Sequence, residues 1–409
     1  MVKRMVKEKL VNDKGDRSLR TYWIHGLYST EVFGEKSRGG LVRTKGVQLL
    51  LKDIIPSTEI IDVVVKPPFR KIATEKGESE ILEFPLERNR IFIRAVSKFL
   101  RSLSPLSNFG VGIGSLSTGV RCEKFLRRVL RDKEKYLLVI DSIRGYMSIK
   151  QIFDELADNS LAVLYLSHNY EPEFVGSKIL WSYIEKVERN VIRSSDLVLA
   201  ASLRDSKVFK CKYGVDEQRM VVLPNIYPVE GLKISKTNSP SVTLVLPDNW
   251  GVKAITNAID YISMSIRMSE KVKNVIIIGG IAGGISRQKE WGGSVVETYG
   301  FIKSRRKFLE VIGRGHIGLN FAFKSAGTNV KKYDYAITEQ VVLSNILGAK
   351  GDLLPYEYTF MDEYDLASKI DQVFDEDYLR MGEQNASFAH KLYRTAKEKI
   401  KKKLLEILK

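Results

Sequence analysis

The residues best suited to chemistry lie in one segment, 326–335, with the sequence AGTNVKKYDY. Gly327 permits a tight turn, and Thr328 is a residue type that caps the start of a helix. Exposed backbone N–H groups at such a helix start attract phosphate oxygens. The segment therefore predicts an anion site at the point where a helix begins.

Two charged side chains of this segment indicate a particular kind of ligand. Lys331 and Asp334 are three residues apart and share one face of the helix. A cation in the first turn can reach a pyrophosphate, and a carboxylate one turn deeper can accept a hydrogen bond from a sugar hydroxyl. The alternative is an ordinary capped helix in which Lys331 and Asp334 form an ion pair, so the residues leave both interpretations open.

The elements that would position these residues form an alternating series. Short β-branched runs alternate with helix-period segments from residue 20 almost to the end of the chain, a pattern typical of parallel sheets covered by helices on both faces. Residues 224–240 interrupt the series with three prolines and a polar cluster, as an interdomain connection would. We therefore predict an α/β fold of two domains with a hinge near residue 235. Two such sheets that face each other create a cleft where ligands meet the carboxyl ends of the strands.

The order of several motifs resembles that of the retaining glycosyltransferases with the GT-B fold, of the family 4 type. These motifs are GTNVKKYDY at 327–335, VVLSN at 341–345, GAKG at 348–351, and the bridge 183–224, which leads into VVLPN at 221–225. In that family the helix binds the diphosphate of the donor and its carboxylate binds the ribose, so the resemblance implies a donor site. Its residues here would be Gly327, Thr328, Asn329, Lys331, Asp334 and Lys253.

The resemblance also covers the first half of the chain. His168 directly follows the apolar run 161–167 and matches the position of the family's active-site histidine. The resemblance implies that His168 contacts the transferring sugar or the acceptor. The other residues that it places on the acceptor side are Gly39, Gly40, Arg43 and Glu171. For His168 the alternative is a strand-end residue that caps a loop. For Arg43 and Glu171 the alternative is a surface residue without a role in binding.

Three positions depart from the family pattern. Asp334 stands where glutamate is usual, Ala326 replaces an acidic residue that contacts the transferred sugar, and Lys253 is what remains of an Arg and Lys pair. These departures imply a different sugar specificity or a weakened enzyme. His25 and His316, which also lie at strand ends, are predicted to be packing residues.

The resemblance assigns a role to each part of the chain. Residues 1–235 would form a Rossmann-like acceptor-side domain and residues 236–385 a Rossmann-like nucleotide-sugar donor domain, facing each other across the cleft. Residues 386–409 predict a basic amphipathic helix. Such a helix either lies on an anionic membrane surface or crosses back to the N-terminal domain, as the last helix of the family tends to do. We expect it to dock on the N-terminal domain.

Composition narrows the range of partners. The chain has 66 Lys and Arg residues against 49 Asp and Glu residues, and the net charge of +17 indicates an anionic partner. No RNP, zinc-finger or helix-turn-helix signature appears, which disfavours nucleic acid. The two cysteines and four histidines lack neighbours at ligand spacing, so we predict no metal site and no cofactor besides the donor substrate. The acidic run 375–377 is interpreted as a solvated surface segment.

Together these observations predict a metal-independent, hexosyl-type glycosyltransferase. It would move a sugar from a nucleotide-sugar donor to a glycan, lipid-linked or protein-linked acceptor, and the resemblance implies retention of configuration. The basic N-terminus has no apolar signal-peptide core, so we expect a cytoplasmic protein, with peripheral contact at the inner membrane face left open. The alternatives are a nucleic-acid-binding protein, an inactive transferase-like scaffold, and another two-domain nucleotide-sugar enzyme such as an epimerase.

Overall fold

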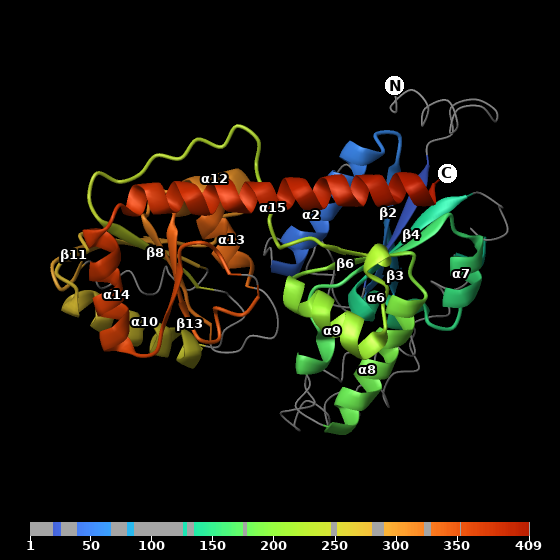
Figure 1. Ribbon diagram of the computed structural model, residues 1–409, viewed down its shortest axis with the longest axis horizontal. Helices are drawn as coiled ribbons and strands as arrows, with labels where there is room; N and C mark the ends of the chain where they lie inside the picture. The colour runs from blue at the N-terminus through green and yellow to red at the C-terminus, as the bar shows by residue number, and fades with distance from the viewer. Residues whose placement is uncertain are drawn as a thin grey trace. The chain divides into compact units, whose positions relative to one another are not determined.

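The computed structural model divides the chain into two compact units (Figure 1). The first comprises Met1–Leu223 with Ala396–Lys409, and the second comprises Pro224–Thr395. The residues that the structure describes are 19–25, 39–66, 80–85, 126–128, 135–174, 178–246, 252–279, 290–322, 329–351 and 353–408.

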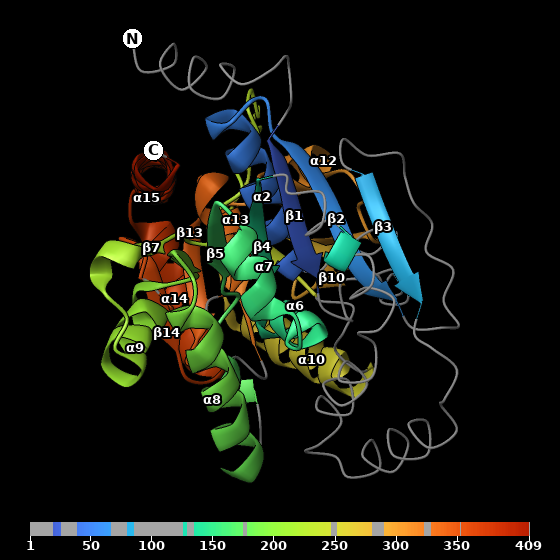
Figure 2. The same cartoon turned by 90° about the vertical axis from the view of Figure 1, so that its right-hand side faces the viewer.

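The first unit is built on a seven-stranded sheet with the strand order β3-β2-β1-β4-β5-β6-β7. Every neighbouring pair of strands in it is parallel. Its strands are β1 (Arg20–His25), β2 (Glu59–Lys66), β3 (Glu80–Pro85), β4 (Tyr136–Asp141), β5 (Ala162–Leu166), β6 (Leu197–Ala200) and β7 (Met220–Val222). Figure 2 shows β1, β2 and β3 side by side at one edge of this sheet. All residues of β4, β5 and β6 are buried, which confirms the predicted parallel sheet covered on both faces.

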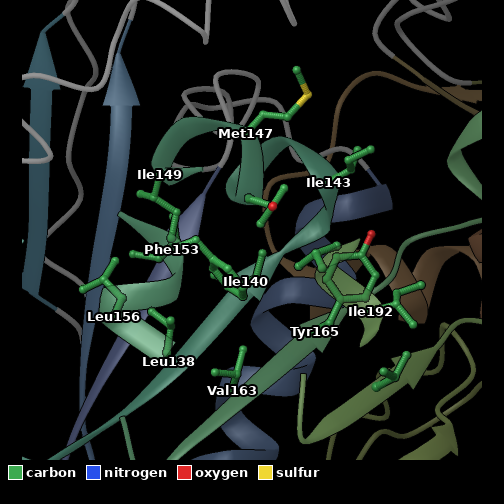
Figure 3. Packing of buried hydrophobic residues seen from close by; sticks show 14 of the residues in the cluster. Leu138, Ile140, Ile143, Met147, Ile149, Phe153, Leu156, Val163, Tyr165 and Ile192 are labelled. Atoms are coloured by element: carbon green, nitrogen blue, oxygen red, sulfur yellow. The ribbon is translucent and has the colours of Figure 1, made fainter. Parts of the chain in front are cut away.

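Helices pack on both faces of this sheet. They are α2 (Gly39–Ile54), α6 (Ser142–Ile149), α7 (Phe153–Asn159), α8 (Lys178–Arg193) and α9 (Leu203–Tyr213), with the short 3-10 helices η3 (Glu171–Phe174) and η4 (Glu217–Arg219). On one face, Leu138 and Ile140 of β4 and Val163 of β5 pack against α6 and α7, including Phe153 and Leu156 (Figure 3). Alternate strand residues turn to the opposite face, so β4 presents Asp141 on the side away from Ile140.

The second unit repeats the same construction. Its seven-stranded sheet has the order β10-β11-β9-β8-β12-β13-β14, and each pair is parallel except β10 with β11. Its strands are β8 (Ser241–Val245), β9 (Asn274–Ile278), β10 (Glu290–Trp291), β11 (Ser294–Tyr299), β12 (Ile317–Asn320), β13 (Val341–Asn345) and β14 (Glu357–Phe360). Its helices are α10 (Val252–Met268), α12 (Arg305–Ile312), α13 (Val330–Ile337), α14 (Glu363–Asp375) and most of α15 (Tyr378–Ile407). The predicted α/β class therefore holds in both units.

The connection between the sheets belongs structurally to the second unit. Residues 224–240 contain no helix or strand, and the boundary falls after Leu223 instead of near residue 235. The reason is that Lys236 anchors this segment: its Nζ lies 2.8 Å from the carbonyl oxygens of Gly315, Thr338 and Glu339. Three acceptors match the three hydrogens of an ammonium group. Burial lowers the pKa of Lys236 to about 7, and these carbonyls favour its charged form.

The last helix, α15, begins at Tyr378, before the expected start at residue 386. Its final part, from Ala396, belongs to the first unit, where Lys397 Nζ lies 2.5 Å from Asp53 Oδ2 of α2. The apolar side chains of Ile400 and Leu404 are fully buried, so this part of the helix already has its apolar face covered by protein. In the part of the chain that the structure describes, no helix is long and apolar enough to cross a membrane.

Gly145 of α6 is a position where the fold requires glycine. A Cβ atom there would lie 2.4 Å from the carbonyl oxygen of Ile24 in β1, far inside van der Waals contact. We predict that Gly145→Ala lowers the free energy of unfolding by about 1–3 kcal/mol, because α6 must move off the sheet. Urea denaturation measures this. Gly300→Ala is the control, since a Cβ there meets nothing within 4 Å, and equal stability losses in the two variants would contradict the prediction.

Candidate functional site

Three strand ends of the first sheet bring polar side chains together. His25 is the last residue of β1, Asp141 is the last residue of β4, and His168 follows β5. These strands are neighbours and parallel, so their carboxyl ends lie at one edge of the sheet. Ser142 has a φ of 62°, an uncommon left-handed conformation for a residue other than glycine, and turns the chain sharply from β4 into α6.

The carboxylate of Asp141 is the centre of this cluster. Its Oδ1 lies 2.5 Å from His168 Nε2. Its Oδ2 accepts hydrogen bonds from Thr44 Oγ1 at 2.8 Å and Trp23 Nε1 at 3.2 Å, and lies 3.1 Å from His25 Nδ1. Burial alone would raise the pKa of Asp141, but His168 and His25 lower it well below its ordinary value. Asp141 is therefore ionised at neutral pH.

His25 lies between two carboxylates. The imidazole is fully buried, with Nε2 2.6 Å from Asp62 Oδ1 on β2 and Nδ1 3.1 Å from Asp141 Oδ2. Burial opposes protonation, but the hydrogen bonds to Asp141 and Asp62 outweigh it and raise the pKa of His25 to about 9. The predicted packing role of His25 is incomplete, because its buried ring lies against two carboxyl groups. His316, by contrast, is a packing residue as expected: it bonds Ser241 Oγ at 2.8 Å, and burial lowers its pKa to about 4.

Of the predicted acceptor-side residues, His168 is partly exposed at the sheet edge, whereas Arg43 is buried. His168 joins the Asp141 cluster and keeps 18% of its side chain exposed. Arg43 is corrected: it is buried, and its Nη atoms donate to the carbonyl oxygens of Leu223 at 2.5 Å and Leu199 at 3.0 Å. It ties strand ends together because a buried guanidinium requires acceptors, so the alternative of a surface position is wrong, and a role toward an acceptor phosphate stays a prediction.

The other predicted acceptor-side residues lie at helix starts. Gly39 and Gly40 are the first residues of α2 and not a loop before it. Glu171 begins η3 and is half-buried, and its backbone N–H donates to Glu188 Oε1 at 3.3 Å. A role for Glu171 toward an acceptor stays a prediction.

A second buried carboxyl group of this unit, Glu188, has its pKa shifted in the opposite direction to that of Asp141. Glu188 of α8 is fully buried, and its Oε2 accepts a hydrogen bond from Tyr213 Oη at 2.9 Å. Burial, and then the charge of Glu171, raise the pKa of Glu188 well above its ordinary value. The first unit therefore holds two buried carboxyl groups whose pKa values are shifted in opposite directions, Asp141 downward and Glu188 upward. The sequence signal for Asp141 was an acidic residue directly after the apolar run of β4, whereas Glu188 has no such signal within its helix.

In the second unit, Lys331 and Asp334 of α13 point to different partners. Lys331 is buried at the carboxyl ends of two strands, where Nζ donates to Val245 O and Phe321 O at 3.1 Å each. Burial lowers the pKa of Lys331 to about 7. Asp334 forms its ion pair with Arg305 of α12. The alternative of an ion pair between Lys331 and Asp334 is therefore wrong.

The start of α13 is fixed by asparagines. The N-cap residue is Asn329, not Thr328 as expected, because the helix begins at Val330. Asn329 Nδ2 donates to Asn320 Oδ1 at the end of β12, 2.8 Å away, instead of capping its own helix. Gly327 and Thr328 lie outside the described residues. Lys253 is exposed in the first turn of α10, after β8.

A buried polar network supports this edge of the second sheet. Asn320 Nδ2 donates to Ser344 Oγ at 2.9 Å, and Ser344 Oγ donates to Glu357 Oε1 at 2.7 Å. Glu357 also pairs with Lys332 of α13 at 2.9 Å, and both of these side chains are fully buried. The carboxyl ends of β12 and β13 and the start of β14 are thus tied to α13. Among the described residues, no three His, Cys, Asp or Glu side chains are arranged to hold a metal ion.

The two α/β units with parallel sheets match the fold of GT-B glycosyltransferases. Alr3699/HepE from Anabaena, solved with UDP, superposes with a TM-score of 0.61 over 95% of this chain and 100% of its own, at 11% identity. An E. coli trehalose-6-phosphate structure bound with UDP-2-fluoro glucose gives 0.61 over 95% and 99%, also at 11% identity. WaaG, a glycosyltransferase involved in lipopolysaccharide biosynthesis, gives 0.54 over 94% and 98%, at 10% identity. No protein-family model and no curated protein sequence matches the chain.

The charge on His25 predicts a particular pH dependence of stability. Its pKa of about 9 in the folded protein exceeds the ordinary 6.5, so protonation stabilises the fold at acid and neutral pH, and this contribution is lost as the pH rises through about 9. We expect the stability advantage of the wild type over His25→Gln to shrink by about 2 kcal/mol between pH 7 and 9.5. Urea denaturation across this range measures it. An advantage that stays constant would mean that the buried ring is neutral.

Proposed function

We propose that this chain is a glycosyltransferase that moves a sugar from a nucleotide-sugar donor to a glycan, lipid-linked or protein-linked acceptor. The observation that carries the proposal is the GT-B fold along nearly the whole chain, with UDP or UDP-sugars bound in several of the similar structures. Function does not follow from a fold alone, so the proposal also rests on the polar residues at the carboxyl edges of both sheets. Retention of configuration and independence from metal are parts of the proposal.

On the donor side, α13 is the element that would meet the nucleotide. The start of a helix at the carboxyl edge of a parallel sheet is suited to a diphosphate, since its backbone N–H groups attract anions. Lys331 adds a cation at the same strand ends, and Lys253 adds an exposed one at the start of α10. Arg305 holds Asp334 through Oδ1, so Oδ2 is the oxygen that we assign to a ribose hydroxyl. Charge on the leaving diphosphate would be stabilised by these groups.

On the acceptor side, His168 is the group that we assign to the reacting sugars. Its Nε2 faces Asp141, an ionised acceptor, so Nε2 carries hydrogen and Nδ1 is left to accept a hydrogen bond. Its partly exposed ring can then position a hydroxyl of the transferring sugar or of the acceptor. Catalysis in this scheme comes from orientation and from leaving-group stabilisation.

Nucleotide binding tests the proposal. Purified protein is titrated with UDP, GDP, ADP and their sugar conjugates, followed by calorimetry and thermal shift. We predict that one nucleotide binds, which at 100 times its dissociation constant stabilises the fold by about 2.7 kcal/mol. Asp334→Ala should weaken that binding about tenfold or more, because a hydrogen bond to a charged group contributes roughly 1.5–3 kcal/mol.

Two variants control this experiment. Asp334→Asn keeps the shape of the side chain and a hydrogen bond to Arg305, which separates donor binding from a loss of folding. Asp375→Ala removes a carboxylate of the same unit that is 62% exposed and pairs with Lys271, and it should leave binding unchanged. If none of the nucleotides binds to the folded wild type, the transferase proposal fails.

A further inference from the structure

We infer that His25 is a positioning residue: a buried imidazolium, clamped between Asp62 and Asp141, that fixes the orientation and the protonated nitrogen of His168 through the carboxylate of Asp141. The consequence for sugar transfer rests on the proposed function, whereas the clamp itself does not. None of the sequence motifs singles out His25, Asp62 or Asp141.

The geometry forms a continuous chain from the sheet interior to its edge. Asp62 Oδ1 lies 2.6 Å from His25 Nε2, His25 Nδ1 lies 3.1 Å from Asp141 Oδ2, and Asp141 Oδ1 lies 2.5 Å from His168 Nε2. Exposure rises along the same path: the side chains of Asp62 and His25 are 0% exposed, that of Asp141 is 7% and that of His168 is 18% exposed. The last member, His168, is therefore the most exposed of the four.

Two protons on His25 would match its two carboxylate neighbours. A neutral imidazole has one N–H and one lone pair, so one of its nitrogens would direct a lone pair at a carboxylate oxygen. With both nitrogens protonated, each faces an acceptor, and the charges alternate as minus, plus and minus from Asp62 to Asp141. An unpaired carboxylate in this interior would be strongly destabilising, and the imidazolium offsets two of them at once.

Neutral donors complete the clamp. Gln48 Nε2 of α2 donates to Asp62 Oδ1 at 2.7 Å, and Thr44 of the same helix donates to Asp141 at 2.8 Å. Trp23 donates to Asp141, and its ring stacks near that of His25 with centroids 6.3 Å apart. These contacts occupy Oδ2 of Asp141, so Oδ1 is directed to His168. The charged groups that face His25 from β2 and β4 are Asp62 and Asp141.

NMR signals of the imidazole nitrogens show which of them carry a proton, and this measurement needs no substrate. The chain has four histidines, so long-range ¹H–¹⁵N spectra of the full-length protein can be assigned with single His→Gln variants. At pH 7.5 we expect His25 to show two protonated nitrogens, and His168 to be protonated at Nε2. A non-protonated nitrogen on His25 at this pH would overturn the proposal.

Variants of the clamp test the coupling to His168. Asp62→Asn, which keeps the imidazole and the volume of the side chain, should weaken proton binding at His25 at least tenfold and change the nitrogen signals of His168. His25→Gln should change the His168 signals further. His316→Gln removes a buried imidazole from the second unit and is the matched control, with no change expected at His168. Identical His168 signals in all variants would refute the coupling.

The rate of sugar transfer in variants of the clamp distinguishes a failure of this inference from a failure of the proposed function. If transfer from the bound nucleotide sugar is found, His25→Gln should lower kcat on the order of 100-fold and leave the donor KM nearly unchanged, because a wrongly oriented imidazole acts poorly while the donor is held elsewhere. Asp62→Asn should shift the pH profile of kcat. Unchanged kcat in His25→Gln would sink the positioning role and leave the transferase intact. Nitrogen signals as expected, with no transfer to any acceptor, would instead sink the proposed function.

Discussion

A carboxylate buried at the end of β4 is the constraint on which the first unit depends. Removing an ion from water costs several kcal/mol, so Asp141 must be surrounded by donors before the sheet edge is stable. Those donors come from β1, from α2 and from His168 in the segment that follows β5. Satisfying one side chain therefore fixes the relative positions of three elements. The sharp turn at Ser142 and the absence of a Cβ at Gly145 follow from the same closeness of α6 to β1.

The second unit contains buried cations, which also need partners. Lys236 and Lys331 direct their ammonium groups at backbone carbonyl oxygens, and Lys332 is paired with Glu357. Carbonyl groups at the ends of strands and helices lack partners in their own element, so they are natural acceptors for a buried cation. The two units differ in this respect: an anionic centre at the first sheet edge can orient an imidazole, whereas Lys331 places a cation at the carboxyl ends of β8 and β12.

Local sequence pattern predicted most of the fold but little of the site. Apolar runs such as β4 predicted parallel strands correctly, because burial on both faces leaves a signal within a few residues. The run of β14, EYTF, was not recognised, since only its last residue is buried and it includes a charge. His25, Asp62 and Asp141 meet only because β2, β1 and β4 are neighbours, and strand order is not written in local spacing. Arg43 was misjudged for the same reason, because its acceptors lie on β6 and after β7.

The same reasoning explains how this fold is shared at 10–11% identity. A parallel sheet covered by helices requires apolar side chains of suitable volume at alternating positions, and many combinations of residues satisfy that requirement. Polar groups at the carboxyl edge obey a stricter rule, since each buried charge needs its own set of partners. Functional residues therefore cannot be assigned to such an edge from the fold alone. The partners of Asp141 and of Asp334 must therefore be established in this chain itself.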